Sequence, residues 1–413
     1  MDTEYRRWQV ENARNALQNR RIVAISGARQ TGKTTITRQI IENGIFRSLD
    51  NFALLRAAQN DPNEFVKNPD AVMTMVIDEI QKVPALMPEI KLAVDKCNRP
   101  GQYLITGSAN IQTVAGIEDS LAGRIKHIRL RPLVVGEILG KKPSFLRRVF
   151  SSEFPIQIKG YDKETIFDLA FRGGYPEALR INESKERKEW RRDYLDSLMN
   201  KDLNDVERIR RLDAVRDLIK ILAAWSGKYM DKGKITGSLE ITRPTFNVYL
   251  NALESLFIFE RVAPWAKTDY DMVGKKSKIY MTDTGLLTSL LNWKRDDIAL
   301  NPDLSGKLME TFVFQELAAQ IDLDSDYSLY QYRDAKKHEI DFIVEKENEG
   351  MAGIEVKASS RVSNEDFVQQ RWFKNNIIKG KLPFVGIVLY SGEDTLSFGD
   401  GMLAVPIAAL WTE

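Results

Sequence analysis

The sequence predicts a multidomain α/β protein, and three observations lead to this prediction. The chain has 413 residues, a length that corresponds to about two to four domains because one hydrophobic core rarely grows that large. A β-branched run over residues 21–26 leads into a glycine-containing loop and a helical pattern, the order found in parallel α/β sheets. A second group of strand patterns, which carries carboxylates, lies towards the C-terminus over residues 339–357.

The composition is that of a globular protein without a dominant charge. The formal net charge is only +2, so any basic surface must be local. The single Cys97 excludes an internal disulfide and a cysteine-rich zinc site, and His127 and His338 are too few for a histidine-rich metal site. The first residues are polar and partly acidic, and no apolar run approaches the ~20 residues that span a bilayer. We therefore expect a cytoplasmic protein without a membrane partner.

One loop fits the phosphate-binding pattern G-x-x-x-x-G-K-[ST] at every position. It consists of Gly27, Ala28, Arg29, Gln30, Thr31, Gly32, Lys33 and Thr34, and Thr35 follows in the predicted helix. In such loops the backbone N–H groups and the helix N-terminus face phosphate oxygens, and the glycines permit tight curvature. Lys33 is expected to reach the β and γ phosphates, and Thr34 to bind Mg²⁺. The alternative is a glycine turn before an ordinary helix, but strand, loop and helix together predict binding of a nucleoside triphosphate, ATP.

Two acids follow the apolar run over residues 72–77, which is typical of a strand buried on both faces of a parallel sheet. Open α/β sheets bind ligands at the carboxyl ends of their strands, so we expect Asp78 to hold Mg²⁺ and Glu79 to orient or deprotonate the attacking water. Two solvated surface acids are the simpler alternative. After another apolar strand, Ser108 either senses the γ phosphate or belongs to a plain turn. Arg124 is either a surface arginine or a residue that stabilises phosphate charge.

Several motifs match a known family in order and spacing. They are GARQTGKTT, VIDEIQKVP, LITGSAN, SLAGR, LRPLVVGEIL, GGYPEA and TDTGLL, which together spread over nearly the whole chain. In these motifs the chain resembles a group of uncharacterised prokaryotic AAA-type ATPases with a C-terminal domain of unknown function. The resemblance implies a nucleotide-driven machine or switch that forms a homo-oligomer, in which Arg124 reaches the γ phosphate of a neighbouring subunit. Ala28 stands where proline is commoner, a departure that should not affect phosphate contacts.

The predicted organisation has four parts. In chain order they are an AAA-type P-loop parallel-sheet domain, a helical connector, a winged helix and a restriction-endonuclease-like α/β domain, over residues 1–150, 151–212, 213–296 and 297–413.

The two middle parts carry the local basic charge. The connector has helical patterns over residues 164–180 and 185–199 whose basic residues alternate with acids, so they are either solvated and salt-bridged or face a phosphate-bearing partner. In a DNA-reading winged helix, the DNA would be contacted by Arg243, Thr245, Asn247 and Lys275 or Lys276. Winged helices also dock proteins, and the sequence does not choose between these partners.

The last part carries charged residues that resemble the site of PD-(D/E)XK nucleases. Glu310 falls on the apolar stripe of a helical pattern, where a carboxylate is costly unless it is paired or bound to metal. Asp341 lies in the next strand pattern, and Glu355 and Lys357 share one face of the strand after it. The resemblance implies that Asp341 and Glu355 hold Mg²⁺ or Mn²⁺, that Glu310 supports them and that Lys357 positions the attacking water. The alternative is a nuclease fold that has lost its activity.

Two functions therefore remain open from the sequence. In the first, the chain is an ATP-dependent enzyme acting on DNA, in genome defence or mobile-element biology, and its nucleotide state controls a metal-dependent nuclease. In the second, it is a nucleotide-operated switch whose inactive nuclease-like domain only docks DNA or protein. The complete set of charged residues favours the first, and the absence of a strongly basic face favours the second.

Overall fold

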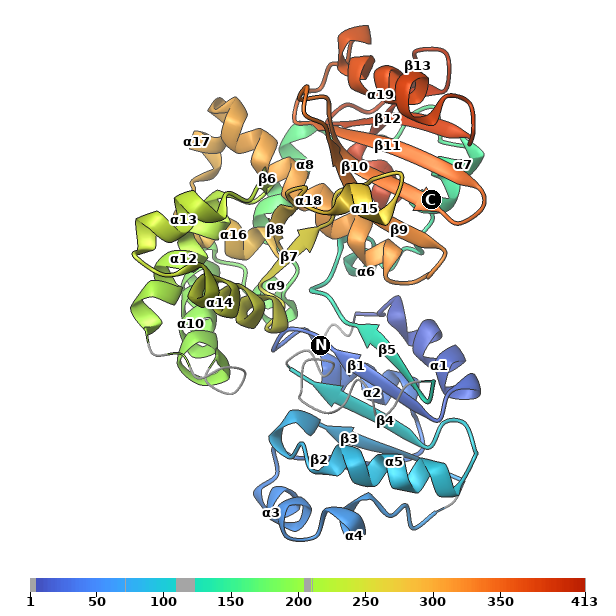
Figure 1. Cartoon of the computed structure of the whole chain (residues 1–413), viewed down its shortest axis with the longest axis vertical. Helices are drawn as coiled ribbons and strands as arrows, with labels where there is room; N and C mark the ends of the chain where they lie inside the picture. The colour runs from blue at the N-terminus through green and yellow to red at the C-terminus, as the bar shows by residue number, and fades with distance from the viewer. Residues whose placement is uncertain (1–4, 71, 109–122, 204–208, 210, 413) are drawn as a thin grey trace. The chain divides into compact units, whose positions relative to one another are not determined.

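The computed structural model (Figure 1) describes residues 5–70, 72–108, 123–203, 209 and 211–412. The chain forms two compact units, residues 1–132 with 251–258 and residues 133–250 with 259–413. The phosphate loop lies in the first unit, and the carboxylates of the C-terminal domain, Glu310, Asp341 and Glu355, lie in the second. Within the described ranges, no helix is long and apolar enough to cross a membrane.

The first unit is built on a five-stranded sheet in the order β2-β3-β4-β1-β5, and every neighbouring pair is parallel. The strands are β1 (Ile22–Ser26), β2 (Gly44–Ser48), β3 (Thr74–Asp78), β4 (Tyr103–Gly107) and β5 (Ile125–Arg129). The helices and one short 3-10 turn are α1 (Gln9–Asn19), α2 (Lys33–Ile40), α3 (Phe52–Asn60), α4 (Pro62–Val66), η1 (Ile80–Lys82) and α5 (Leu86–Lys96).

The central strands of this sheet are buried because they carry continuous apolar runs. Every residue of β1 and β4 is buried, as is every residue of β3 after Thr74. This confirms the parallel α/β sheet that the sequence predicts. Strand β5 is not evident in the sequence because Lys126, His127 and Arg129 interrupt its apolar pattern. An edge strand tolerates these residues, since only one side of it pairs within the sheet.

The first half of the second unit is mainly helical, with a small antiparallel sheet in the order β6-β8-β7. Its strands are β6 (Lys228–Tyr229), β7 (Phe259–Val262) and β8 (Lys278–Met281). Its helices, with one π-helical turn η3, are α6 (Val135–Ile138), α7 (Phe145–Ser151), α8 (Lys163–Arg172), α9 (Pro176–Arg180), α10 (Ser184–Ser197), η3 (Leu198–Asp202), α12 (Leu212–Ala224), α13 (Lys232–Leu239), α14 (Arg243–Ser255), α15 (Asp269–Met272), α16 (Thr284–Leu290) and α17 (Arg295–Leu300). Residues 251–255, the end of α14, belong to the first unit.

Two of the short sequence motifs meet in this unit. The single helix expected over residues 164–180 is interrupted at Gly173, which has a φ of +65°, and at Gly174, where a Cβ would lie 2.0 Å from the carbonyl oxygen of Leu133. The N–H of Gly174 donates to Asp283 at 2.7 Å, and the same carboxylate caps α16. The GGYPEA and TDTGLL motifs therefore pack against each other, which explains why both contain glycine.

The second half of this unit is a mixed six-stranded sheet in the order β13-β14-β12-β11-β10-β9. Phe314 of its long helix α18 packs against Phe342 of β10, and Phe373 of α19 packs against Tyr332 of β9. The strands are β9 (Tyr327–Arg333), β10 (Glu339–Lys346), β11 (Gly350–Lys357), β12 (Phe384–Tyr390), β13 (Leu396–Ser397) and β14 (Met402–Pro406). The helices and turns are α18 (Pro302–Ile321), η4 (Asn364–Phe367), α19 (Val368–Phe373), η5 (Lys374–Ile378) and η6 (Ile407–Leu410).

Glu316 of α18 is a buried carboxylate with one unsatisfied oxygen. Its Oε1 accepts the N–H of Val135, at the start of α6, at 2.8 Å. Its Oε2 is buried and has no hydrogen-bond partner among the described residues. Burial, together with the nearby Glu137, raises the pKa of Glu316 to about 8. The protonated carboxyl is therefore the form that the folded chain favours at neutral pH.

We expect Glu316→Gln to remove a pH dependence of stability. A carboxyl whose pKa is raised on folding stabilises the protein fully below its unfolded pKa, and this contribution is lost as the pH rises through the folded pKa of about 8. The wild type should thus lose melting temperature between about pH 4.5 and about pH 8 relative to Glu316→Gln, whose amide oxygen still accepts from Val135. Glu189→Gln, at an exposed position of α10, is the control and should follow the wild type. Parallel curves for the wild type and Glu316→Gln would contradict the burial argument.

Candidate functional site

The phosphate loop joins the end of β1 to the start of α2, and its glycines have different roles. Gly32 has a φ of +93°, a conformation that residues with a Cβ rarely adopt, and Gln30 also has a positive φ, +63°. A Cβ on Gly27 would lie 2.2 Å from the carbonyl oxygen of Leu130. Gly27 is therefore required by a close backbone approach, whereas Gly32 provides the curvature that the pattern predicts.

Lys33 lies inside the loop rather than on its surface. Its side chain is only 5% exposed, and its Nζ donates to the carbonyl oxygens of Gly27 and Ala28, both at 3.0 Å. Thr31 is fully buried and donates to the same Ala28 carbonyl at 2.8 Å. The lysine charge is thus held over the loop, at the N-terminus of α2, where a phosphate would meet both the ammonium and the helix dipole.

The two side chains expected to hold Mg²⁺ are in direct contact. The Thr34 hydroxyl donates to Oδ2 of Asp78 at 2.9 Å, and Thr106 donates to the other oxygen of the same carboxylate. Asp78 is 5% exposed and ends β3, whereas Thr34 follows β1, and β4 lies between these strands. A hydroxyl and a carboxylate side by side are oxygen ligands of the kind that Mg²⁺ prefers, so the residues fit this ion.

Glu79 has a strained backbone at the same edge of the sheet. Its φ and ψ of 60° and 46° are left-handed, which is uncommon for a residue other than glycine. Its N–H donates to Thr106 Oγ1 at 3.2 Å, and its carboxylate accepts from Ser108 at 3.0 Å and from Gln81. The predicted Ser108 therefore lies beside Glu79. Thr106, which ends the apolar run in the sequence and lies within β4, bonds both neighbouring acids, a role that the sequence did not assign to it.

Arg124 lies at the amino ends of the strands, whereas the phosphate loop lies at their carboxyl ends. It precedes β5, whose first residue pairs with Ile22 at the start of β1, whereas the loop follows the end of β1. The Arg124 guanidinium forms a two-pronged ion pair with Asp95 of α5, at 2.6 Å and 3.3 Å. Arg124 thus cannot serve the phosphate site of its own chain, and its role towards a neighbouring subunit remains a prediction.

The residues expected to contact DNA in the middle region are partly engaged with neighbouring side chains. Lys276 pairs with Asp231 at 3.6 Å, and Asn247 accepts from Lys232 at 3.1 Å. These contacts are solvent-facing and compatible with either a DNA or a protein partner. The choice between the two partners therefore remains open.

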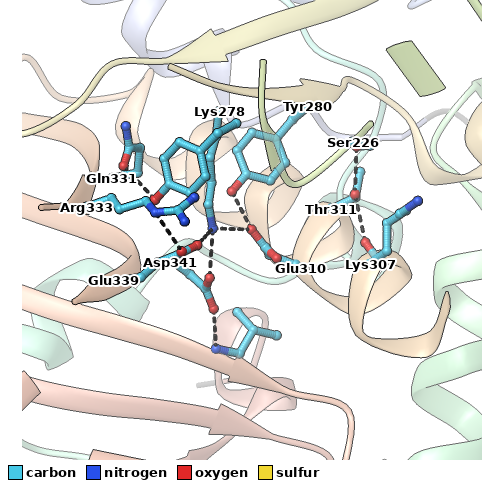
Figure 2. A network of polar contacts seen from close by, with 12 residues as sticks. Ser226, Lys278, Tyr280, Lys307, Glu310, Thr311, Gln331, Arg333, Glu339 and Asp341 are labelled. Carbon is cyan, nitrogen blue, oxygen red and sulfur yellow. Dashed lines mark hydrogen bonds and ion pairs between the residues drawn. The ribbon is translucent and has the colours of Figure 1, made fainter. Parts of the chain in front are cut away.

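A buried lysine lies among the carboxylate side chains of the C-terminal domain (Figure 2). Lys278 of β8 is 1% exposed, and its Nζ lies 3.0 Å from Glu310 of α18 and 3.0 Å and 2.9 Å from Glu339 and Asp341 of β10. The Tyr229 ring lies 5.4 Å from the same Nζ. One ammonium group thus forms ion pairs with carboxylates from two separate elements.

Further contacts fix these carboxylates in place. Tyr280, two residues after the lysine on β8, donates to Glu310 at 2.6 Å, and the N–H of Val356 donates to Asp341 at 3.1 Å. Gly227 has a φ of +75°, and a Cβ there would lie 3.2 Å from the Glu310 carboxylate. Thr311, next to Glu310 on α18, exchanges a hydrogen bond with Ser226 at 2.9 Å (Figure 2). Helix α18 is therefore tied to β8 and to the turn before β6 by polar contacts.

The charges in this cluster shift one another's protonation. Burial alone would lower the pKa of Lys278, but the Asp341 and Glu310 carboxylates raise it well above its ordinary value. Burial, and then the charge of Asp341, raises the pKa of both Glu310 and Glu355. Lys278 is thus held in its charged form. The effect of Asp341 on the pKa of Glu355 also shows that these two carboxylates lie close together.

The structure brings together Glu310, Asp341 and Glu355, as the sequence predicts, but arranges them around a lysine. Among the described residues, no group of three or more His, Cys, Asp or Glu is placed to hold a metal ion. The role of Asp341 and Glu355 as metal ligands therefore remains a prediction, and in this structure the Lys278 ammonium pairs with Asp341 and Glu310. Lys357, expected to position water, lies 3.5 Å from Asp366. The missed signal was a lysine two residues before a tyrosine in an otherwise apolar strand.

Three segments of the chain match known protein families. Residues 19–139 match a family described as an AAA domain, and residues 163–297 and 305–410 match two families described as domains of unknown function, DUF8612 and DUF4143. The match to the AAA domain family, together with the phosphate loop and the acids at the sheet edge, supports ATP binding and hydrolysis by the chain. The match over residues 305–410 does not show a nuclease-like fold.

The similar proteins extend over most of the chain. An uncharacterised protein of Mycobacterium tuberculosis is 29% identical over 410 residues, 98% of this chain and 85% of that protein. One of Methanocaldococcus jannaschii is 25% identical over 351 residues, 81% and 74% of the two chains. A solved Walker-type ATPase of Pyrococcus abyssi aligns with 68% of this chain and 94% of its own, with a TM-score of 0.41 and 15% identity. The Holliday junction branch migration motor of Thermotoga maritima covers 61% and 86%, with a TM-score of 0.28 and 18% identity.

We expect nucleotide binding to depend on Lys33, because its ammonium is the positive charge held over the loop. A ligand at ~100 times its dissociation constant stabilises a protein by about 2.7 kcal/mol. Mg²⁺ and ATP should therefore raise the melting temperature of the wild type and raise that of Lys33→Ala far less. Lys96→Ala, an exposed lysine at the end of α5, should behave as the wild type. Equal shifts in all three proteins would remove the assignment of this loop.

Proposed function

We propose that the chain is a Mg²⁺-dependent ATPase that works as a nucleotide-operated switch. The observation that supports this best is the chain of contacts from Thr34 through Asp78 and Thr106 to the backbone of Glu79. It links the residue expected to hold the metal to the residue expected to handle water. A structural change at the phosphate position can therefore be transmitted to Glu79, whose left-handed backbone is the strained part of the site.

Each residue of the site has a distinct part in hydrolysis. Lys33 and the loop N–H groups bind the β and γ phosphates and stabilise the charge that develops on them. Thr34 and Asp78 would hold Mg²⁺, which neutralises phosphate charge when it is bound. Glu79 accepts the proton of the attacking water or orients it, and the Ser108 hydroxyl, 3.0 Å from its carboxylate, fixes its direction. Because Arg124 is turned away from this site, it would act only on a neighbouring subunit in a homo-oligomer.

In this proposal the C-terminal domain does not work as a metal-dependent nuclease. Instead, the ion pairs of Lys278 hold its carboxylates together. Replacing a divalent ion by an ammonium removes both the Lewis acid and the site where it would activate water. The region around β6, β7 and β8 would be a winged helix, since a helix, a strand, two helices and two strands follow one another, with the short helix α15 between the last two strands. It would dock DNA or a protein when the nucleotide state changes.

A second function is favoured by one observation, the convergence of Glu310, Asp341 and Glu355. If β8 withdrew Lys278, these carboxylates could hold Mg²⁺ or Mn²⁺, with Lys357 close by, and cut DNA under nucleotide control. The two functions differ in whether the wild type responds to metal in this domain. They therefore differ in a measurable way.

For hydrolysis, we expect Glu79→Gln to retain ATP binding and lose turnover. The amide keeps the size and the hydrogen bond to Ser108 but cannot take a proton. Loss of a general base typically lowers the rate by about 10²- to 10⁴-fold. Steady-state phosphate release, with ATP-induced thermal stabilisation measured beside it, tests this. Glu42→Gln, an exposed acid after α2, is the control, and unchanged turnover in Glu79→Gln would exclude the role.

For the C-terminal domain, we expect Lys278→Met to destabilise the chain strongly. Removing one partner of a buried ion pair typically costs about 3–5 kcal/mol because the other charges remain unpaired. Lys276→Met, two residues away and with a side chain 59% exposed, is the matched control and should have little effect. Thermal denaturation of both variants measures the difference.

Metal and DNA assays on the wild type separate the two functions. The switch requires that neither Mg²⁺ nor Mn²⁺ stabilises the protein through Asp341, and that no linear, branched or single-stranded DNA is cut with or without ATP. If metal stabilises the wild type, and Asp341→Ala and Lys357→Ala abolish cutting while ATP hydrolysis continues, the nuclease takes the place of the switch.

A further inference from the structure

A groove of about 310 Å³ lies among α10, η3, α12 and the end of α16 in the second unit. It is separate from both sites described above, since none of their residues lines it. Helices α10 and α12 both contact α16, so the walls of the groove belong to one packed group. Pockets that hold small ligands typically begin at about this volume.

The walls of the groove carry four basic side chains and one acid. Lys188 and Arg192 are four residues apart on α10, and Arg216 and Lys220 are four residues apart on α12, so each pair lies on one helix face. Asp196, the one carboxylate in the lining, lies 4.0 Å from Arg216. An exposed ion pair of this kind contributes little to stability, so Arg216 can give up Asp196 to pair with a ligand. The lining therefore has an excess of positive charge on both walls.

The floor of the groove is apolar. Leu195, Met199 and Ile219 line it and are 4%, 9% and 1% exposed, and Leu290 of α16 joins them. A phosphate alone would make no contact with this apolar floor. Proteins that bind a nucleic-acid backbone usually do so with an extended polar surface. An apolar floor between cationic walls suits a molecule that has a flat apolar group and a charged group together.

We propose that this groove binds a small organic phosphate of about mononucleotide size. The two arginines, one on each wall, offer planar donor pairs that match phosphate oxygens, and the lysines add charge. The apolar group of the ligand lies on the side chains of Leu195, Met199 and Ile219. The groove is thus a second anion site, independent of the phosphate loop, on the helical region that follows the AAA domain.

The test uses the full chain with Lys33→Ala, so that the phosphate loop does not compete. Adenosine monophosphate, adenosine and inorganic phosphate are titrated by calorimetry. The proposal expects adenosine monophosphate to bind at least about tenfold more tightly than either fragment, because only it meets both floor and walls. Equal binding of inorganic phosphate, equal binding of adenosine, or no binding of any probe would overturn the proposal.

Variants in the same background locate the binding. Arg192→Ala and Arg216→Ala should each weaken adenosine monophosphate by about 10-fold, the effect of one lost charge-assisted hydrogen bond of about 1.4 kcal/mol or more. Lys185→Ala, on the same helix but outside the lining, is the matched control and should bind as the parent does. If all three variants bind equally, or all lose affinity equally, the groove is not the site.

A macromolecular partner is distinguished in the same experiment. If a DNA duplex or an acidic peptide binds and loses affinity in Arg192→Ala and Arg216→Ala, while adenosine monophosphate does not bind, the groove is a docking surface and the small-ligand proposal fails. Melting temperatures of the variants, which change only exposed arginines, verify that the fold is kept.

Discussion

The Lys278 ammonium lies within 3.0 Å of carboxylates from α18 and β10, although it belongs to the small sheet of the helical region. A buried charge of this kind is tolerated only when opposite charges surround it, because water no longer solvates it. Removing the lysine would leave Glu310, Glu339 and Asp341 facing one another. Its pairing with them therefore fixes β8 against α18 and β10, and with them the two segments matched by families of unknown function.

The phosphate site depends on a second constraint, the order of the parallel strands. Because β4 is the neighbour of β3, its Thr106 can donate to the Asp78 carboxylate and accept from the N–H of Glu79. Glu79 is held in a left-handed conformation at this point, a state that costs of order 1–3 kcal/mol unless the surroundings hold it. The strain lies next to the carboxylate expected to handle water.

Glycine appears in the second unit where backbones and charges approach closely. Gly174 allows contact with the backbone of Leu133 and donates to Asp283, and Gly227 lies against the Glu310 carboxylate. Arg191 lies against Gly285, and burial lowers the pKa of its guanidinium to about 10. At these positions the close packing of backbone and charged groups explains the glycine.

The sequence alone determined the phosphate loop, because its strand, turn and helix are contiguous and the backbone geometry of eight neighbouring residues is set locally. It also indicated Asp78, since an acid that ends a buried strand must lie at the carboxyl edge of a parallel sheet. Tertiary structure decided the rest. Thr106, the pairing of Arg124 with Asp95, and Lys278 among the carboxylates each join segments that are far apart in the chain. Hydrophobic periodicity gives the faces of helices and strands but not which faces meet, so the residue that neutralises a buried charge cannot be read from spacing.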